Sequence, residues 1–297
     1  MDLLQLHAFR TVARLEHVTR AAEALRVAQP ALSKMIARLE AELGVRLFDR
    51  RGRRITLNTF GRVFLRHVER VFMALAEGRQ ELTDLAGLER GTVTVAATTL
   101  RLLPDLLGAF LAHNAGVNFR LSQASTAAMQ ERLLAGEIDL CLASAPIVGP
   151  AIRAVALFTE DILLAVPPHH RLAGCGPIPL GEAAAEPFIS MAQGYWLREL
   201  TDDACRQAGF LPNIICEGDE PSAIRSLVAA GLGVAFLPRS ARRARGGPEV
   251  AWLHITAPVC QRTVSLVWRE DRYLSAAARR FRQFVVEYFA SSPERVG

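Results

Sequence analysis

The sequence predicts an α/β protein of two similar lobes, preceded by a small helical module with a two-stranded wing and by one long helix. Residues 1–90 hold 16 basic and 11 acidic side chains, whereas residues 91–297 hold 19 of each, so the net charge of +5 lies entirely in the first third. Residues 58–88 lack proline and repeat apolar residues in a heptad pattern. From residue 92 onward, strand-like runs alternate with amphipathic segments, which indicates parallel βαβ units.

Three helices are predicted in the basic module. Residues 2–15 space their apolar side chains as an amphipathic helix does, and residues 18–26 form a short second helix. The third helix lies within residues 28–44. Because only Val27 and Ala28 separate the second and third helices, the turn has helix-turn-helix length.

The third helix is expected to present a smooth, basic outer face. At about 100° per residue, one side of this helix holds the apolar residues Leu32, Ile36, Leu39 and Leu43. The opposite side holds Pro30, Ala31, Lys34, Ala37, Arg38 and Ala41. We expect that outer face to carry cations and no carboxylate, as a surface for a polyanion does.

Residues 46–58 alternate apolar residues around an arginine-rich turn, which predicts a two-stranded wing with a basic tip. Gly52 is flanked by Arg50, Arg51, Arg53 and Arg54. The alternative is a solvated run of charge on an ordinary hairpin.

The long helix of residues 58–88 would extend about 45 Å at about 1.5 Å per residue. Its seam consists of Phe64, Val68, Val71, Leu75, Gly78, Leu82 and Leu85. Packing of the seam within the chain is one alternative, but a helix this long and one-sided favours pairing with a second copy.

The α/β region divides into two sets of strands and helices. Strands are expected at 92–98, 117–125, 138–144, 161–167, 187–190, 213–218, 234–238 and 262–269. Helices are expected at 102–113, 127–137, 197–209, 223–231 and 275–290. Short linkers near 158–163 and 264–269 would join the lobes, and residues 167–179 would form a surface loop.

Several classes of protein are disfavoured by what the sequence lacks. The five cysteines are scattered without a C-x-x-C pair, so we expect reduced, mostly buried thiols and no metal site or cofactor. No apolar run approaches the length of a membrane span, and the N-terminus lacks the features of a secretory signal. No P-loop, dinucleotide fingerprint or nucleophile elbow is present, which argues against an enzyme. We expect a cytoplasmic protein.

Residues 1–66 contain LHAFRTVARLEHVTRAAEALRVAQPALSKMIARLEAELGVRLFDRRGRRITLNTFG, a pattern that resembles the LysR-type transcriptional regulators. The resemblance implies a winged helix-turn-helix domain, a long linker helix and an α/β effector region of two periplasmic-binding-protein-like lobes. Two further stretches, LEHVTRAAE and GYWLRELTDDACRQAGF, are similar to the branch around glutamate-synthase regulators. The chain departs from the family pattern at His17, where Ser or Thr is usual, and at Asn58-Thr59, where Thr-Pro is usual. We expect His17 to weaken a helix cap by about 1 kcal/mol.

The resemblance implies which residues contact double-stranded DNA. Positions near the start of the recognition helix match Gln29, Pro30, Ser33 and Lys34, which would read base edges in the major groove. Arg53 matches the wing position that enters the minor groove. Arg50, Arg51 and Arg54 would meet phosphates or pair with carboxylates such as Asp49. Arg38, on the outer face of the third helix, is a further candidate for DNA binding.

A small effector is expected where strands end and helices begin. The candidate residues are Thr98, Thr99, Ser125, Thr126, Ser190, Gly194, Glu217 and Gly218. Thr99 and Ser125 match positions that often touch effector in the family, and plain helix capping is the alternative for both. Because helix N-termini attract anions, we predict a carboxylate effector.

The expected organisation is a DNA-binding domain at 1–58, a linker and dimerisation helix at 59–90, and an effector-binding domain at 91–297. The first lobe would comprise 91–160 and 267–297, and the second 161–266. Expected partners are promoter or operator DNA, the effector, further copies in a dimer and a homotetramer, and RNA polymerase, with no membrane contact. The competing hypothesis is an enzyme or a solute-binding module that shares the lobes. Its catalytic constellation or secretion signal is missing from the sequence, whereas the basic N-terminal module is present.

Overall fold

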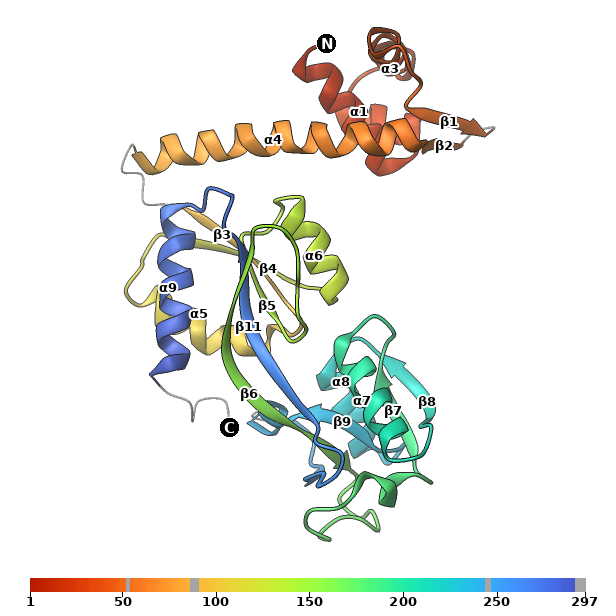
Figure 1. Cartoon of the computed structure of the whole chain (residues 1–297), viewed down its shortest axis with the longest axis vertical. Helices are drawn as coiled ribbons and strands as arrows, with labels where there is room; N and C mark the ends of the chain where they lie inside the picture. Colours follow the sequence, from red (N-terminus) through yellow and green to blue (C-terminus); the bar gives the residue numbers. More distant parts are fainter. Residues whose placement is uncertain (52–53, 86–90, 244–246, 292–297) are drawn as a thin grey trace. The chain divides into compact units, whose positions relative to one another are not determined.

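The computed structural model describes residues 1–51, 54–85, 91–243 and 247–291 (Figure 1). The chain divides into two compact units, Met1–Gln80 and Glu81–Gly297.

The first unit is helical with a two-stranded wing. Its elements are α1 (Leu3–Leu15), α2 (Val18–Leu25), α3 (Gln29–Leu43), β1 (Phe48–Arg51), β2 (Arg54–Leu57) and the start of α4 (Thr59–Leu85). Phe9, Leu32 and Leu39 are fully buried in the core that these elements share. The helices and the hairpin predicted from the sequence are therefore present.

Side chains close the start of each of the first two helices. Asp2 and Gln5 form a reciprocal capping box at α1. At α2, the Nδ1 atom of His17 accepts a hydrogen bond of 3.4 Å from the backbone N–H of Arg20. The imidazole thus supplies the cap that we expected this position to weaken, although the bond is long for an N–H···N contact.

The unusual Asn58 at the end of the wing also has a structural role. Its Oδ1 accepts from the N–H of Gly61 at 2.9 Å, and its Nδ2 donates to the carbonyl of Arg46 at 2.8 Å. Asn58 therefore caps α4 and fastens it to the segment before β1. Gly61 is needed beside it, since a Cβ atom there would lie 2.1 Å from the carbonyl oxygen of Leu47.

The second unit is built on a seven-stranded mixed sheet in the order β10-β6-β11-β5-β3-β4, with β9 also paired to β6. Its strands are β3 (Thr92–Ala97), β4 (Asn118–Gln123), β5 (Leu140–Ala143), β6 (Ile152–Val166), β9 (Ala235–Pro238), β10 (Ala251–Leu253) and β11 (Gln261–Arg269). A separate parallel pair consists of β7 (Pro187–Met191) and β8 (Asn213–Gly218).

In the first lobe, helices cover both faces of the parallel strands β3, β4 and β5 (Figure 1). Its helices are α5 (Leu103–Leu111), α6 (Thr126–Leu134) and α9 (Ala276–Ala290). Alternate residues of β3 explain the layering: Val93 and Val95 pack with α5 and α9, whereas Ala96 packs with α6.

The second lobe has α7 (Trp196–Gln207) and α8 (Pro221–Ala229) on opposite faces of its strands. The described part of this unit also contains 3₁₀ turns: η1 (Leu100–Leu102), η2 (Leu180–Ala183) and η3 (Arg239–Arg243). Of these, η1 belongs to the first lobe and η3 follows β9 in the second.

The two lobes share β6 and β11, which are paired from Ile152↔Arg269 to Asp161↔Gln261. The segments near 158–163 and 264–269, where linkers were expected, lie within these two shared strands, so strands and not loops join the lobes there. The sequence pattern missed the first half of β6 and the whole of β10. A bulge between Val264 and Ser265 is the irregularity in this pairing.

All five cysteines are free thiols, and Cys141, Cys205 and Cys260 are buried. Burial raises the pKa of the Cys141 and Cys205 thiols to about 12, which keeps both protonated and unreactive at neutral pH. Across the described residues, no helix combines the length and apolarity required to cross a membrane.

Candidate functional site

The outer face of α3 is exposed along its length. Gln29, Pro30 and Lys34 are exposed, and Ser33 is partly so. The Nε2 of Gln29 donates to the hydroxyl of Ser33 at 3.3 Å, which places the two side chains one turn apart on the same face. Inward packing of Leu32, Ile36 and Leu39 leaves this face free for a partner.

That face is not free of carboxylates, which corrects the expectation from the sequence. Arg38 lies 3.5 Å from the carboxylate of Glu42 one turn later, and Glu42 also pairs with the N-terminal ammonium group. The Arg38 side chain nevertheless remains 75% exposed, so it can exchange Glu42 for another anion. Lys34 has no carboxylate within ion-pair distance among the described residues.

The wing brings Arg51 and Arg54 opposite each other across the hairpin, with Arg50 opposite Ile55. The side chains of Arg50, Arg51 and Arg54, and the whole of Arg53, lie outside the described residues. Their predicted contacts therefore stay predictions.

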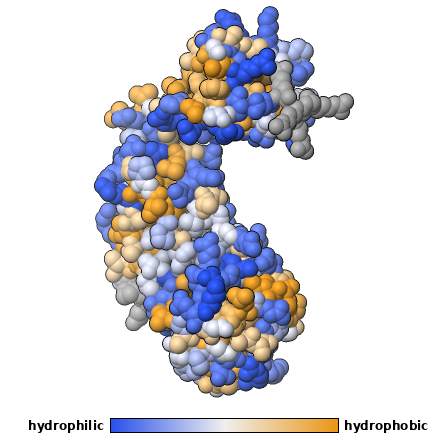
Figure 2. Space-filling model, turned by 45° about the vertical axis from the view of Figure 1, so that its right-hand side comes forward, coloured by the Kyte–Doolittle hydropathy of each residue, from blue (hydrophilic) through white to orange (hydrophobic). Residues whose placement is uncertain are grey.

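The seam of α4 has two parts. Phe64 and Val68 pack in the core of the first unit, and Val68 is 2% exposed. The later seam residues Val71, Leu75, Leu82 and Leu85 are exposed, Leu82 and Leu85 by 68% and 78%. Figure 2 shows apolar surface, in orange, on both units of the chain.

A cavity lies in the second unit where residues of the two lobes meet. Its lining consists of Thr98, Thr99, Arg101, Ser144, Met191, Tyr195, Trp196, Leu197, Pro221, Pro238, Ser240, Ala241 and Arg262. Together with its open mouth it encloses about 510 Å³.

The topology explains why these side chains converge. Thr98 and Ser144 follow the carboxyl ends of the neighbouring parallel strands β3 and β5, so both reach the same edge of the sheet. The opposite wall includes the first residues of α7 and α8, Trp196 and Pro221. Neither helix has a side-chain cap, and their N-termini carry partial positive charge.

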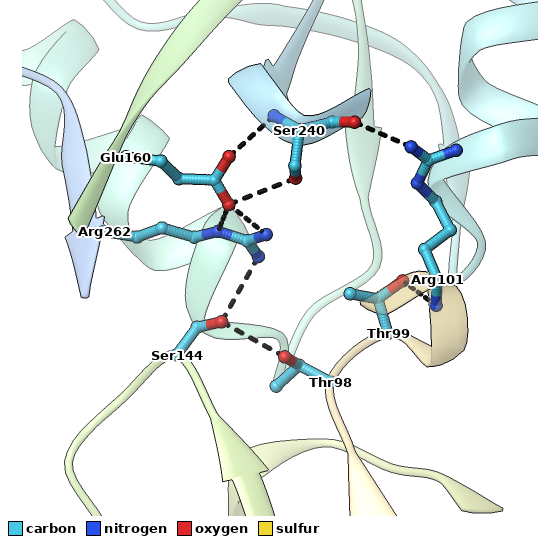
Figure 3. A network of polar contacts seen from close by, with 7 residues as sticks. All are labelled: Thr98, Thr99, Arg101, Ser144, Glu160, Ser240 and Arg262. Atoms are coloured by element: carbon cyan, nitrogen blue, oxygen red, sulfur yellow. Dashed lines mark hydrogen bonds and ion pairs between the residues drawn. The ribbon is translucent and has the colours of Figure 1, made fainter. Parts of the chain in front are cut away.

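A buried ion pair on the two shared strands supports the cavity (Figure 3). Arg262 of β11 donates to Oε1 of Glu160 from Nε at 2.8 Å and from Nη2 at 2.6 Å, and the two side chains are 5% and 2% exposed. Glu160 also accepts from the backbone N–H and the hydroxyl of Ser240. The Nη1 of Arg262 donates to Ser144, whose hydroxyl lies 3.1 Å from that of Thr98.

Arg101 extends this network from the first lobe to the second. Its Nη2 donates to the carbonyl of Ser240 at 2.6 Å, and its backbone N–H bonds to the hydroxyl of Thr99 at 3.4 Å. Burial lowers the pKa of Arg101, the charges of Arg225 and Arg262 lower it further, and Glu160 acts in the opposite sense. The surroundings of Arg101 are therefore short of negative charge.

The predicted effector residues are only partly brought together. Thr98 and Thr99 line the cavity, but Ser125, Thr126, Ser190, Gly194, Glu217 and Gly218 are not part of its lining. Ser125 caps α6 through the N–H of Ala128, and the Thr126 hydroxyl is buried without a partner among the described residues. Ser190 lines a smaller cavity of about 290 Å³.

The remaining candidates have structural roles. Glu217 forms a 2.6 Å ion pair with Arg198, and the carbonyl of Gly218 accepts from Ala192. Gly194 takes a φ of 86°, a left-handed value that favours glycine, in the turn before α7.

Sequence reasoning missed Arg101, Ser144, Glu160, Ser240 and Arg262. A signal was available for Ser144, which follows β5 as Thr98 follows β3. No local signal marks Glu160 and Arg262, which are 102 residues apart and meet through strand register. Within the described part of the chain, no cluster of three or more His, Cys, Asp or Glu residues could hold a metal ion.

Comparison with known proteins covers both units. Residues 3–62 match the family described as a bacterial regulatory helix-turn-helix protein of the lysR family, and residues 86–290 match the LysR substrate binding domain.

Two relatives from Bacillus subtilis (strain 168) align over nearly the whole chain. The uncharacterized HTH-type transcriptional regulator YybE is 38% identical over 295 residues, covering 98% of this chain and 100% of YybE. The transcriptional dual regulator GltC is 37% identical over 299 residues, covering 98% of each chain. Both are named as regulators rather than enzymes.

Among solved structures, full-length CbnR in complex with its target DNA superimposes with a TM-score of 0.70 at 26% identity, covering 97% of this chain and 99% of CbnR. The similarity therefore spans the helical unit and both lobes.

Proposed function

This chain belongs to the LysR family of DNA-binding transcriptional regulators with an effector-binding domain, and we propose that a small carboxylate bound in the lobe cavity controls how it acts on an operator. The proposal has two parts, one for each unit. The first concerns how the DNA sequence is read, and the second concerns the effector.

For DNA, we assign base contacts to Gln29, Pro30, Ser33 and Lys34 at the start of α3. Their exposure and common face support this role, since a recognition helix contacts base edges with its N-terminal residues. Arg38 exchanges its exposed pairing with Glu42 for a phosphate, and the wing arginines Arg50, Arg51, Arg53 and Arg54 contact the backbone and the minor groove.

For the effector, the observation that carries the proposal is the unmatched charge of Arg101 at the cavity. Among the described residues, no carboxylate lies within ion-pair distance of Arg101, which donates instead to a main-chain carbonyl. The hydroxyls of Thr98 and Thr99 and the N-terminus of α7 border the same space. A carboxylate would satisfy the guanidinium and accept from these donors, because charge-assisted hydrogen bonds are the strong ones.

The test uses the full chain and a panel of straight-chain carboxylates with the corresponding uncharged amides. We expect at least one carboxylate to raise the melting temperature and its amide not to do so. Arg101→Gln should weaken the binding of that carboxylate by about 1.5–3 kcal/mol, which is the contribution of a hydrogen bond to a charged group.

Arg120→Gln is the matched control, because it removes an exposed arginine of β4 outside the cavity lining. A panel in which amides bind as well as carboxylates, or in which Arg101→Gln has no more effect than Arg120→Gln, would contradict the proposal.

We further propose that two copies pair through the exposed seam of α4, that lobe contacts assemble dimers into a tetramer, and that the regulator acts in the cytoplasm beside RNA polymerase. The exposure of Val71, Leu75, Leu82 and Leu85 supports the first step, because a helix rarely leaves so regular an apolar face in water.

A further inference from the structure

A second cavity lies next to the first and shares Arg101, Pro221 and Ala241 with it. Its other lining residues are Glu220, Ser222, Ala223, Arg225, Ser226, Gly247 and Pro248. It encloses about 580 Å³ together with its mouth. The first turn of α8 forms part of its wall, so the partial positive charge of that helix end faces the same space.

Arg225, on α8, is the buried charge of this second cavity. The residue is 9% exposed, and its Nη1 donates to the carbonyl of Ala241 at 3.2 Å. Its Nε has no hydrogen-bond partner among the described residues, and its guanidinium carbon lies 5.6 Å from the ring centre of Trp252. Gly247 lets the backbone pass directly over the guanidinium, since a Cβ atom there would lie 2.7 Å from Nη1.

Arg101 and Arg225 therefore converge on consecutive carbonyls of η3, those of Ser240 and Ala241. In the described structure neither guanidinium has a carboxylate within ion-pair distance. The carboxylate at the cavity, that of Glu220, is exposed and accepts a hydrogen bond from the Ser222 hydroxyl. Arg225 is buried and Arg101 is exposed, and the charge of Arg225 helps to lower the pKa of Arg101, so the two guanidinium groups repel each other. An anion bound by both groups would offset this repulsion.

We propose that Arg101 and Arg225, one from each lobe, form a subsite for an oxyanion, a carboxylate or phosphate group, in this second cavity. The shared lining gives this group two sources: a second acidic group of the effector that extends past Arg101, or a free inorganic anion. The first source rests on the proposed carboxylate effector, whereas the second does not.

The test compares the full chain with its Arg225→Gln variant, which keeps a donor for Ala241 but removes the charge. The probes are inorganic phosphate and straight-chain monocarboxylates and dicarboxylates of equal carbon number, measured by calorimetry and thermal shift. If the group belongs to the effector, a dicarboxylate binds more tightly than its monocarboxylate, and Arg225→Gln removes that advantage, about 10- to 100-fold. If the anion is free, phosphate stabilises the wild type and not the variant.

Two further variants separate loss of the site from loss of the fold. Ser222→Asp places a carboxylate one turn before Arg225, in the first turn of α8 where a negative charge is favourable. This variant should abolish the preference for a dicarboxylate over its monocarboxylate without lowering the melting temperature. Arg242→Gln, an exposed arginine of η3 outside both linings, should leave binding of every probe unchanged.

The inference is overturned if monocarboxylates and dicarboxylates bind alike and phosphate has no effect that depends on Arg225. In that case the carboxylate effector itself survives, because monocarboxylate binding still depends on Arg101. If no carboxylate binds the wild type while phosphate binds in an Arg225-dependent manner, the oxyanion subsite is supported and the proposed carboxylate effector is contradicted. If none of the probes binds the wild type, the oxyanion subsite and the carboxylate effector are both contradicted.

Discussion

Glu160→Gln should strongly destabilise the effector-binding region, because it leaves Arg262 charged and buried without its partner. The Glu160 carboxylate accepts four hydrogen bonds, two from Arg262 and two from Ser240. The glutamine side chain keeps one oxygen as an acceptor, but an NH₂ group, which only donates, replaces the other oxygen. Breaking a buried pair by neutralising one member costs about 3–5 kcal/mol, which is a large part of the stability of a typical domain, about 5–15 kcal/mol.

Tryptophan fluorescence during urea unfolding measures this cost without interference from the DNA-binding unit. All three tryptophans, Trp196, Trp252 and Trp268, lie in the second unit. The variant should lower the urea midpoint with little change in the slope, whereas DNA binding by the first unit should persist at low urea.

An exposed ion pair near the far ends of the same two strands provides the control. Arg153 and Glu270 lie 2.6 Å apart with side chains 59% and 58% exposed, so Glu270→Gln should cost less than about 1 kcal/mol. A second variant that replaces both Glu160 and Arg262 by apolar residues should recover much of the lost stability. The reasoning is refuted if Glu160→Gln costs no more than Glu270→Gln.

Four further changes test other parts of the structure. Lys34→Ala should cost about 1–3 kcal/mol on operator DNA selected from a random pool and less on random duplex, measured by fluorescence anisotropy; equal losses would contradict base reading. Replacing both Val71 and Leu75 by aspartate should give monomers in analytical ultracentrifugation, and a dimer that persists would show that the two copies pair through another surface. Gly61→Ala should cost about 1–3 kcal/mol of first-unit stability by circular dichroism, because its Cβ meets a carbonyl of the wing; an unchanged midpoint would contradict this. Burial raises the pKa of Asp139, so the contribution of this carboxyl group to stability falls as the pH rises. In urea unfolding, Asp139→Asn should therefore raise the free energy of unfolding relative to the wild type more at neutral pH than at about pH 4. If the difference between variant and wild type does not change with pH, the reasoning is contradicted.

Local sequence patterns predicted most of the elements because each helix and most strands carry their own signal. The heptads of α4 and the apolar faces of α1 and α3 lie within one segment and need no knowledge of the rest of the chain. Thr98 and Thr99 were predictable for the same reason, since a polar residue after a buried parallel strand reaches the edge where ligands bind.

The parts that were missed depend on contacts between distant segments. Glu160 lies in a stretch that looked like a linker, and its pairing with Arg262 follows from the register of β6 and β11. Ser125 looked equivalent to Thr99, yet its hydroxyl caps α6 and it lies outside the cavity lining. Arg101 and Arg225 come from different lobes, and no pattern within either segment shows that both donate to η3.

The pairing of Asp161 with Gln261 makes the second lobe an insertion within a β-hairpin. The 99 residues between these two partners leave the first lobe and return to it at adjacent points of the same ladder. A short turn could therefore join β6 to β11 and leave β3, β4, β5 and their helices continuous, because insertions with neighbouring ends do not interrupt the host domain. The second lobe therefore extends one side of the first lobe and does not divide its chain into two separate parts.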